Sequence, residues 1–233
     1  MVAAVAATPI VIFAGILIAQ VFASRARERT HKKIQRFPSK SVSVGALHGG
    51  KLAWQRLVDY HAAQMDAVSL HAAETELKNL LEEEQPDLDK LQRTVAKLEM
   101  SGKEEHALAE LEKAVERVKK GKKLHEAYEI EMLLVEMLIY KGDFEKAYNC
   151  ECLKHDEISD ARRPLYKAIL HVMLDHPKEA KICWDDFQDI QGHFQWPPSF
   201  NEIQVDKVII DFKEFEKVVK VLKDDITKAH AKK

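Results

Sequence analysis

The sequence predicts an all-α protein in which one N-terminal membrane-spanning helix precedes a helical body. Two observations lead to this fold class. Glycine and proline are scarce, at 8 and 7 among 233 residues, and long stretches rich in Ala, Glu, Lys and Leu favour helices. The chain also begins with an uncharged run as long as a bilayer crossing. We expect a transmembrane anchor at 1–24, a basic flank and linker at 25–50, a helical body at 51–199 and a C-terminal helix at 200–233.

The expected anchor is the run of 22 uncharged residues from Val2 to Ala23. At about 1.5 Å per residue it would span roughly 33 Å, which matches a hydrocarbon core about 30 Å thick. The charges that flank it are strongly asymmetric, because nearly all follow the run, and the positive side of a span faces the cytosol, stroma or matrix. The basic residues of this flank are Arg25, Arg27, Arg29, Lys32, Lys33, Arg36 and Lys40.

A cleaved signal peptide ending at Ala23 is the alternative, but the charged segment that should precede its apolar core is missing. The anchor and its flank resemble the signal anchors of mitochondrial and chloroplast outer-membrane proteins, which favours those membranes over the endoplasmic reticulum. The basic residues would either bind anionic lipid headgroups or only fix the topology. Three unpaired cysteines and the lack of any Asn-x-Ser/Thr acceptor favour a reducing compartment.

In the body, apolar residues recur at helical spacing, and turn residues separate the helical stretches. The first helix begins near Lys51 and ends before Pro86. The most apolar stretch, 132–140, is too short to cross a bilayer and should form the central buried helix. Asp143 is a natural N-cap and Pro177 suits a first helical turn. Further helices are expected over 88–98, 108–118, 143–157, 161–175, 177–191 and about 200–229.

A short motif recurs within the body. Gly142–Ala147 (GDFEKA) is matched by Asp175–Ala180 (DHPKEA) 33 residues later and by Gly102–Ala107 (GKEEHA) 40 residues earlier. The motif resembles the turn between the two helices of a tetratricopeptide repeat, where a Gly ends helix A and an Ala on helix B permits close packing. The resemblance covers about 87–191 and implies a stack of helix pairs. An unrelated helical bundle is the alternative.

The repeat is degenerate, because the small helix-A position holds Val95, Val135 and Ala168. Glu151 and Lys154 stand where the second repeat should be apolar, so its second helix should be rotated or shifted. The resemblance implies a partner groove lined by helix-A side chains, with Gln92, Glu131, Arg162 and Tyr166 as candidates. A carboxylate clamp for chaperone C-termini is not supported, since the aligned positions hold Gln92, Ala96, Leu133, Arg162 and Tyr166 and only Arg162 fits.

Nothing in the sequence indicates catalysis, a cofactor or a metal. On a helix, Cys150 and Cys152 would point apart, with His155 elsewhere, whereas structural zinc needs four converging ligands. The P-loop, dinucleotide and HExxH motifs are absent from the sequence. With 36 Lys and Arg against 38 Asp and Glu, a globally basic nucleic-acid surface is not expected. The aromatic-proline stretch around Trp196 would contact a partner or pack against the repeats.

These observations predict a membrane-anchored helical-repeat scaffold or adaptor. It would bind protein partners at an organelle or endoplasmic reticulum membrane and serve in import, assembly or tethering. The alternative is a structural accessory subunit of a stable multi-subunit membrane complex.

Overall fold

The computed structural model describes residues 48–50, 53–54, 57, 67–99, 101–192 and 211–231. The chain divides into two compact units, Met1–Arg36 and Phe37–Lys233, and all described residues belong to the second. The expected anchor at 2–23, the basic residues of the flank and the stretch around Trp196 therefore lie outside the described residues.

The described part of the chain is helical, which confirms the all-α prediction for these residues. Within the same part, none of the helices combines the length and the apolar character that crossing a membrane requires. The elements in chain order are α4 (Ala67–Glu82), α5 (Leu88–Leu98), α6 (Glu104–Lys120), α7 (Leu124–Lys141), α8 (Phe144–Tyr148), the 3₁₀ helix η2 (Glu151–Lys154), α9 (Arg162–Met173), α10 (Pro177–Gln191) and α12 (Phe212–Ala231).

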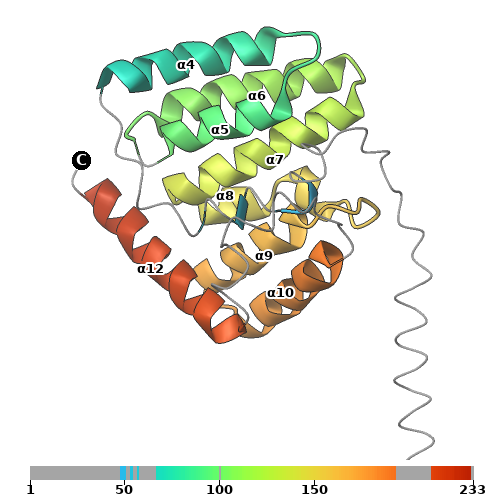
Figure 1. Cartoon of the computed structure of the whole chain (residues 1–233), viewed down its shortest axis with the longest axis vertical. Coiled ribbons are helices and arrows are strands. Elements are labelled where there is room, and N and C mark those ends of the chain that lie inside the picture. Colours follow the sequence, from blue (N-terminus) through green and yellow to red (C-terminus); the bar gives the residue numbers. More distant parts are fainter. Residues whose placement is uncertain are drawn as a thin grey trace, which may run out of the picture. The chain divides into compact units, whose positions relative to one another are not determined.

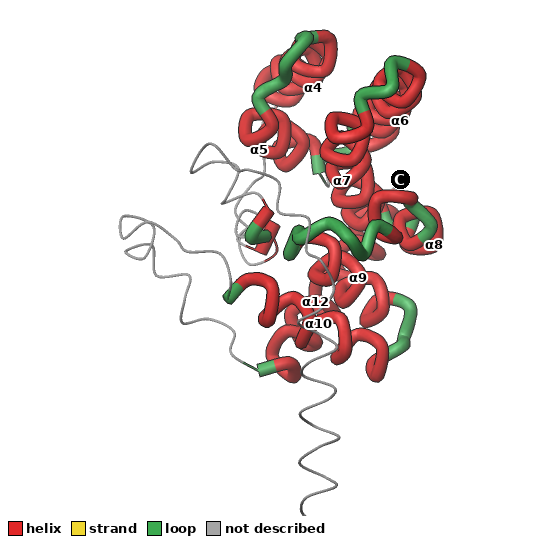
Figure 2. The backbone as a smooth tube through the Cα atoms, turned by 90° about the vertical axis from the view of Figure 1, so that its right-hand side faces the viewer, coloured by secondary structure: helices red, strands yellow, loops and turns green. Residues whose placement is uncertain are grey.

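Neighbouring helices in the sequence also lie side by side in space. The closest pairings are α4 with α5, α6 with α7, and α9 with α10. Figure 2 views α4 to α7 roughly along their axes, with the α4–α5 pair beside the α6–α7 pair and with α9 and α10 below them. Helix α7 contacts both α5 and α9, so it joins the two ends of the stack, and α12 packs on α9.

Helix α7 forms the centre of the core, as its composition predicts. All 14 residues from Ala127 to Tyr140 are buried, on every side of the helix. A helix buried all round needs neighbours on each face, and α5, α6, α8 and α9 supply them. Three of the buried residues are glutamates, at positions 129, 131 and 136, and each requires a polar partner.

The three turns with the recurring motif share one backbone feature. Gly102, Gly142 and Asp175 have φ values of +85°, +90° and +60°, the left-handed conformation that ends a helix. At Gly142 the amides of residues 142 and 143 donate to the carbonyls of Ile139 and Leu138 and close the end of α7. A Cβ at Gly142 would also lie 3.2 Å from Ile226 Cγ2 of α12, so both backbone and space favour glycine there.

The helix expected over 143–157 is wrong beyond residue 148. Helix α8 has only five residues, and Cys150 adopts an extended conformation (φ −58°, ψ 141°) before η2 begins. Two side chains replace the lost helical bonds. The amide of Asn149 donates to the carbonyl of Glu145, and the Glu131 carboxylate accepts the backbone N–H of Glu151. The side chain of Asp143 makes no cap hydrogen bond, contrary to its expected role.

Candidate functional site: a buried charged cluster

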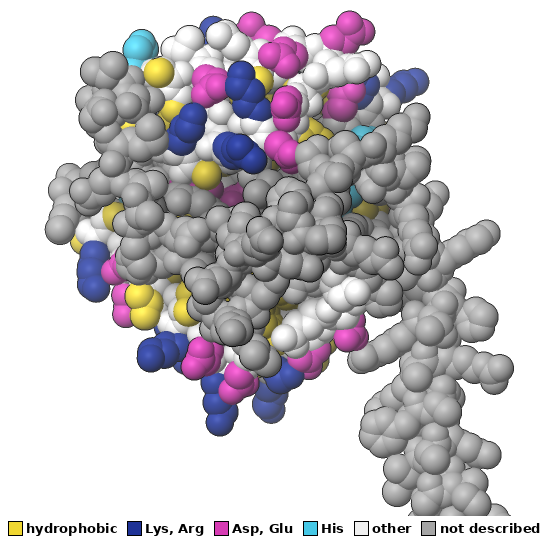
Figure 3. All heavy atoms as spheres, viewed as in Figure 1, with side chains coloured by type: hydrophobic (Ala, Val, Ile, Leu, Met, Phe, Trp, Pro, Cys, Tyr) yellow, Lys and Arg dark blue, Asp and Glu magenta, His cyan; other side chains and the backbone are white. Residues whose placement is uncertain are grey.

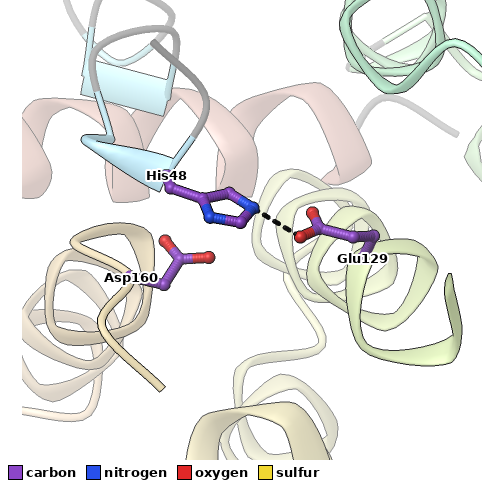
Figure 4. A group of neighbouring side chains, drawn as sticks. All are labelled: His48, Glu129 and Asp160. Carbon is purple, nitrogen blue, oxygen red and sulfur yellow. Dashed lines mark hydrogen bonds and ion pairs between the residues drawn. The ribbon is translucent and has the colours of Figure 1, made fainter. Parts of the chain in front are cut away.

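The most prominent polar feature of the described body is a cluster between α7 and α9. Glu129 and Tyr128 come from α7, Arg162 begins α9, and Asp160 lies two residues before Arg162. His48 joins them from a segment 81 residues before Glu129 in the chain. Figure 4 shows His48, Glu129 and Asp160 pointing toward one another. All five are buried, and the Arg162 side chain is only 1% exposed.

Arg162 holds the two carboxylates of the cluster together. Its Nη2 donates to Glu129 Oε2 at 2.7 Å and to Asp160 Oδ2 at 2.6 Å, and its Nε donates to Asp160 Oδ1 at 3.1 Å. Asp160 Oδ1 also accepts the backbone N–H of Arg162 at 2.9 Å. That contact satisfies a free amide in the first turn of α9, where a negative charge is favourable. The hydroxyl of Tyr128 donates to Asp160 Oδ2 at 3.2 Å.

His48 completes the cluster with its side chain and its backbone. The imidazole Nε2 lies 2.6 Å from Glu129 Oε1, the carboxylate oxygen that Arg162 does not use. The carbonyl of His48 accepts the N–H of Ala161 at 2.7 Å. Two carboxylates and one guanidinium leave one negative charge, which a cationic imidazole would neutralise. His48 therefore links the N-terminal segment to both helices of the cluster.

The ionisation of these groups follows from their contacts. Burial opposes the charge on Glu129, but Arg162 and the hydrogen bond from His48 outweigh it and lower the pKa of Glu129 to about 2. Burial likewise opposes the charge on Arg162, yet Asp160 and Glu129 raise its pKa well above the ordinary value. Burial and Asp160 raise the pKa of Tyr128. Glu129 and Arg162 therefore stay charged as a buried ion pair, with the neutral phenol of Tyr128 close by.

A second buried network joins α7 and α9 to α5. Glu136 Oε2 of α7 accepts from Gln92 Nε2 of α5 at 3.2 Å and from the Tyr166 hydroxyl of α9 at 3.1 Å. Burial and the nearby carboxylate of Glu136 raise the pKa of Tyr166, so the phenol stays neutral and donates. This network ties α5, α7 and α9 together through one carboxylate.

All four residues expected to line a groove are buried in this structure. Gln92 and Tyr166 meet at Glu136, and Arg162 lies in the charged cluster. Glu131 joins neither network. Its carboxylate pairs with Lys119 at 3.2 Å and accepts the N–H of Glu151, so it holds α6, α7 and η2 together.

Sequence reasoning missed the partners of these residues. Glu129 and Glu136 lie seven residues apart in the most apolar helix of the body, which places them on one face and was a usable signal. Acids amid such a stretch need buried partners, and basic or hydroxyl residues on a neighbouring helix could supply them. No comparable signal marked His48, which lies in a glycine-rich stretch that reads as linker.

The cluster contains donor atoms of the kind that bind metals. One ligand atom from each of His48, Glu129 and Asp160 lies within 4.8 Å of the others. However, the guanidinium of Arg162 already donates to both carboxylates, so a metal ion would have to compete with it. The His48–Glu129 pair also has the composition of an acid–base dyad, but both side chains are almost inaccessible to solvent. The contacts are best suited to holding segments of the chain together.

The three cysteines are thiols with little tendency to ionise. Burial raises the pKa of Cys150 to about 11, and it also raises the pKa values of Cys152 and Cys183. The sulfur of Cys150 lies 3.6 Å from the carbonyl oxygen of Lys146. Raised pKa values reduce the thiolate fraction that nucleophilic or metal-binding chemistry needs.

No family model, curated protein or solved structure matches this chain. The features of the chain that bear on its function are the three turns with the recurring motif and the two buried polar networks.

Proposed function

We propose that the protein is a membrane-anchored scaffold of the tetratricopeptide type, whose helical body binds protein partners. The observation that carries the proposal is the equivalence of its three turns. Each has a left-handed residue, at Gly102, Gly142 or Asp175, and the next residue stands at the N-cap of the following helix. Lys122, just before the N-cap of α7, has the same conformation, so it is this conformation together with the recurring motif that favours a repeat over an unrelated bundle.

The alanine that ends each motif supports the same interpretation. Ala107, Ala147 and Ala180 are each no more than 2% exposed. They lie in α6, α8 and α10, the helix that follows each turn, and the closest packing across such a turn is that of α9 with α10. The short α8 is the degenerate member, in keeping with the polar Glu151 and Lys154 that follow it.

In such a stack, α5, α7 and α9 would be the first helices of the repeats and α12 the cap. Two polar networks tie these first helices together, so the body presents a fixed surface. Fixed surfaces bind partners with little loss of conformational entropy. On the face shown in Figure 3, the described side chains carry both signs of charge, which suits a protein partner better than a polyanion.

The membrane part of the proposal rests on residues 2–23 and on the basic flank from Arg25 to Arg36. An anchor would concentrate the body at the surface of a mitochondrial or chloroplast membrane and raise its effective concentration toward membrane-bound partners. Import, assembly or tethering are the roles that such a scaffold serves.

Proximity labelling in cells tests this function. A labelling enzyme fused to the C-terminus of the full chain should mark proteins of one organelle surface, facing cytosol, stroma or matrix. Neighbours from a lumen would contradict the orientation. The matched control is the same fusion with Arg25, Arg27 and Arg29 replaced by Ser. This change weakens the charge asymmetry that sets the orientation, so the labelled proteins should come from more than one compartment.

Purification of the full chain in detergent separates a scaffold from an accessory subunit. A scaffold should remain folded and monodisperse without its partners, because its core is complete. A chain that aggregates whenever its neighbours are removed would instead be a subunit of a stable complex.

A further inference from the structure

A buried histidine lies where the short helix α8 meets α9. His171 belongs to the last turn of α9 and is only 8% exposed. Two rings pack against its imidazole: Tyr148 of α8, with centroids 5.1 Å apart in a T-shaped arrangement, and His176 of the turn before α10, at 5.9 Å. The N–H of His176 also donates to the carbonyl of His171 at 2.8 Å. We call His171, His176 and Tyr148 the histidine cluster.

The surroundings of His171 favour its neutral form. Its Nδ1 is buried and has no hydrogen-bond partner within the described part of the chain. A neutral imidazole can carry its proton on Nε2 and leave Nδ1 as a bare acceptor, whereas an imidazolium carries a proton on both nitrogens. The cation would therefore hold a buried donor without an acceptor, which is costly. Burial accordingly lowers the pKa of His171.

The charges near His171 also oppose its protonation. His176 and Lys167, one turn earlier on α9, would repel an imidazolium, whereas Glu179 of α10 would attract it. Charged groups on the other elements that pack on α9 have partners of their own. These pairs are Lys223 of α12 with Asp175, Glu129 and Glu136 of α7 with Arg162 and Tyr166, and Lys154 of η2 with Glu151. Among the described groups, Glu179 is thus the acid that faces His171.

Helix α8 is held to the body by few contacts. It has only five residues, and Ala147 is the one that is buried. It packs on α7 and α9, and Tyr148, which is 38% exposed, supplies its ring contact with His171. Elements with few buried contacts open locally at a low cost in free energy. The imidazole of His171 can therefore reach water if α8 moves away from α9.

We propose that the histidine cluster is a pH-sensitive contact, which releases α8 from α9 under mildly acidic conditions. A histidine whose pKa is lowered by burial binds its proton more readily in the opened state than in the closed one. The closed state therefore loses stability as the pH falls below the ordinary value of 6.5. Acid would thus change the surface of the second repeat. This property belongs to the fold and does not depend on the proposed scaffold function.

Native-state hydrogen exchange of the full chain in detergent, at pH 7.5 and pH 5.5, tests the proposal. Protection factors remove the intrinsic dependence of exchange on pH. Those of the Ala147, Asn149 and His176 amides should fall severalfold at pH 5.5, to a limit of about tenfold that one proton sets. Amides in the centre of α7 should keep their protection. Protection in α8 that is unchanged, or absent at both pH values, would overturn the proposal. So would higher protection in acid, because the Tyr148 ring would then stabilise the imidazolium.

The variant His171→Phe identifies the titrating group. Phenylalanine keeps a ring against Tyr148 but takes up no proton, so the protection of α8 should become nearly independent of pH. His71→Gln is the matched control, because His71 lies in α4 with its side chain 84% exposed. This control should keep the pH dependence of the natural chain. A pH dependence that survives His171→Phe would assign it to another group and overturn the proposal.

Tyr148→Ala tests the contact from the side of α8, and gives an answer even where His171→Phe does not fold. Removal of the half-exposed ring uncovers His171, which can then take up its proton without any movement of α8. The protection of α8 should therefore be lower than in the natural chain at pH 7.5 and should no longer fall at pH 5.5. An unchanged pH dependence in this variant would show that Tyr148 does not couple His171 to α8, and the proposal would fail.

Discussion

Arg162 compensates two buried carboxylates at once, and its removal is the harshest single change in the charged cluster. In Arg162→Met, Glu129 and Asp160 would lose their main cationic partner while remaining buried. Breaking a buried ion pair on one side typically costs about 3–5 kcal/mol, because an uncompensated charge remains. We expect a loss of that order in the free energy of unfolding, measured by urea denaturation of the full chain in detergent.

Lys181→Met is the matched control for this prediction. Lys181 pairs with Asp185 at the surface, where both side chains are about half exposed. Surface ion pairs contribute about 0–1 kcal/mol, so this variant should remain close to the natural chain. Similar losses in both variants would mean that the buried cluster contributes no more than a surface contact.

Glu129 makes the stability of the body depend on pH in the acid range. Its pKa is about 2 in the folded chain against an ordinary 4.5. A carboxyl whose pKa is lowered by folding adds stability above its unfolded pKa, and this contribution disappears as the pH falls through the folded value. The free energy of unfolding should therefore decline from about pH 4.5 toward pH 2.

The variant Glu129→Gln isolates this contribution from other carboxylates with lowered pKa values, such as Glu74, Glu76 and Glu110. The difference in stability between the natural chain and the variant should shrink as the pH falls over the same range. Urea titrations at half-unit pH steps measure it. A difference that stays constant with pH would show that Glu129 is not the titrating group.

Single elements show how far local sequence determines this fold. Gly142 correctly predicts the end of α7, and Pro177 correctly predicts the start of α10, because backbone conformation at these residues is a local property. The end of α8 was missed, since it depends on Glu131, which captures the amide of Glu151 from a different helix. Tertiary contacts of this kind override helix propensity.

In the candidate site, too, local sequence predicted some features and missed those that depend on tertiary contacts. The resemblance to the repeat placed Gln92, Arg162 and Tyr166 on the first helices of the expected pairs and predicted that they line a partner groove. It could not show that Glu136 joins the first and last of them, because periodicity defines a face and not its partner. The contact between His48 and Glu129 spans 81 residues and a glycine-rich stretch, so no local pattern announces it.

The end of α7 provides a test at the scale of an element. Gly142→Ala introduces a Cβ at a φ of +90° and against Ile226 of α12, so it should cost at least about 1 kcal/mol of unfolding free energy. Asp175→Gly at the equivalent turn should cost less, because relief of a φ of +60° offsets both the more flexible unfolded chain and the lost surface ion pair with Lys223, which is worth about 0–1 kcal/mol. Thermal denaturation of both variants measures the contrast. An equal loss from Asp175→Gly would show that the left-handed conformation at residue 175 does not favour glycine as it does at residue 142.

At the scale of the whole described body, two kinds of contact hold the stack together. Buried polar networks join α5, α7 and α9. Aromatic packing joins α10 and α12 through Trp184, Phe187 and Phe215. The short stretch that contains His48 and Trp54 contacts both, because His48 pairs with Glu129 and the ring of Trp54 lies 5.4 Å from that of Trp184.

Phe215 provides the test of the aromatic contact. It is fully buried in α12 and stacks on Trp184, so Phe215→Ala should cost about 3–5 kcal/mol and loosen α12 from the body. Phe212→Ala, one turn earlier on the same helix, removes a ring that is only half-buried and should cost clearly less. Hydrogen exchange after each substitution should show α12 losing protection in the first variant while α7 keeps it. Equal losses from the two phenylalanines would mean that α12 is held by general burial along its length, not by the aromatic cluster that Phe215 forms with Trp184 and Trp54.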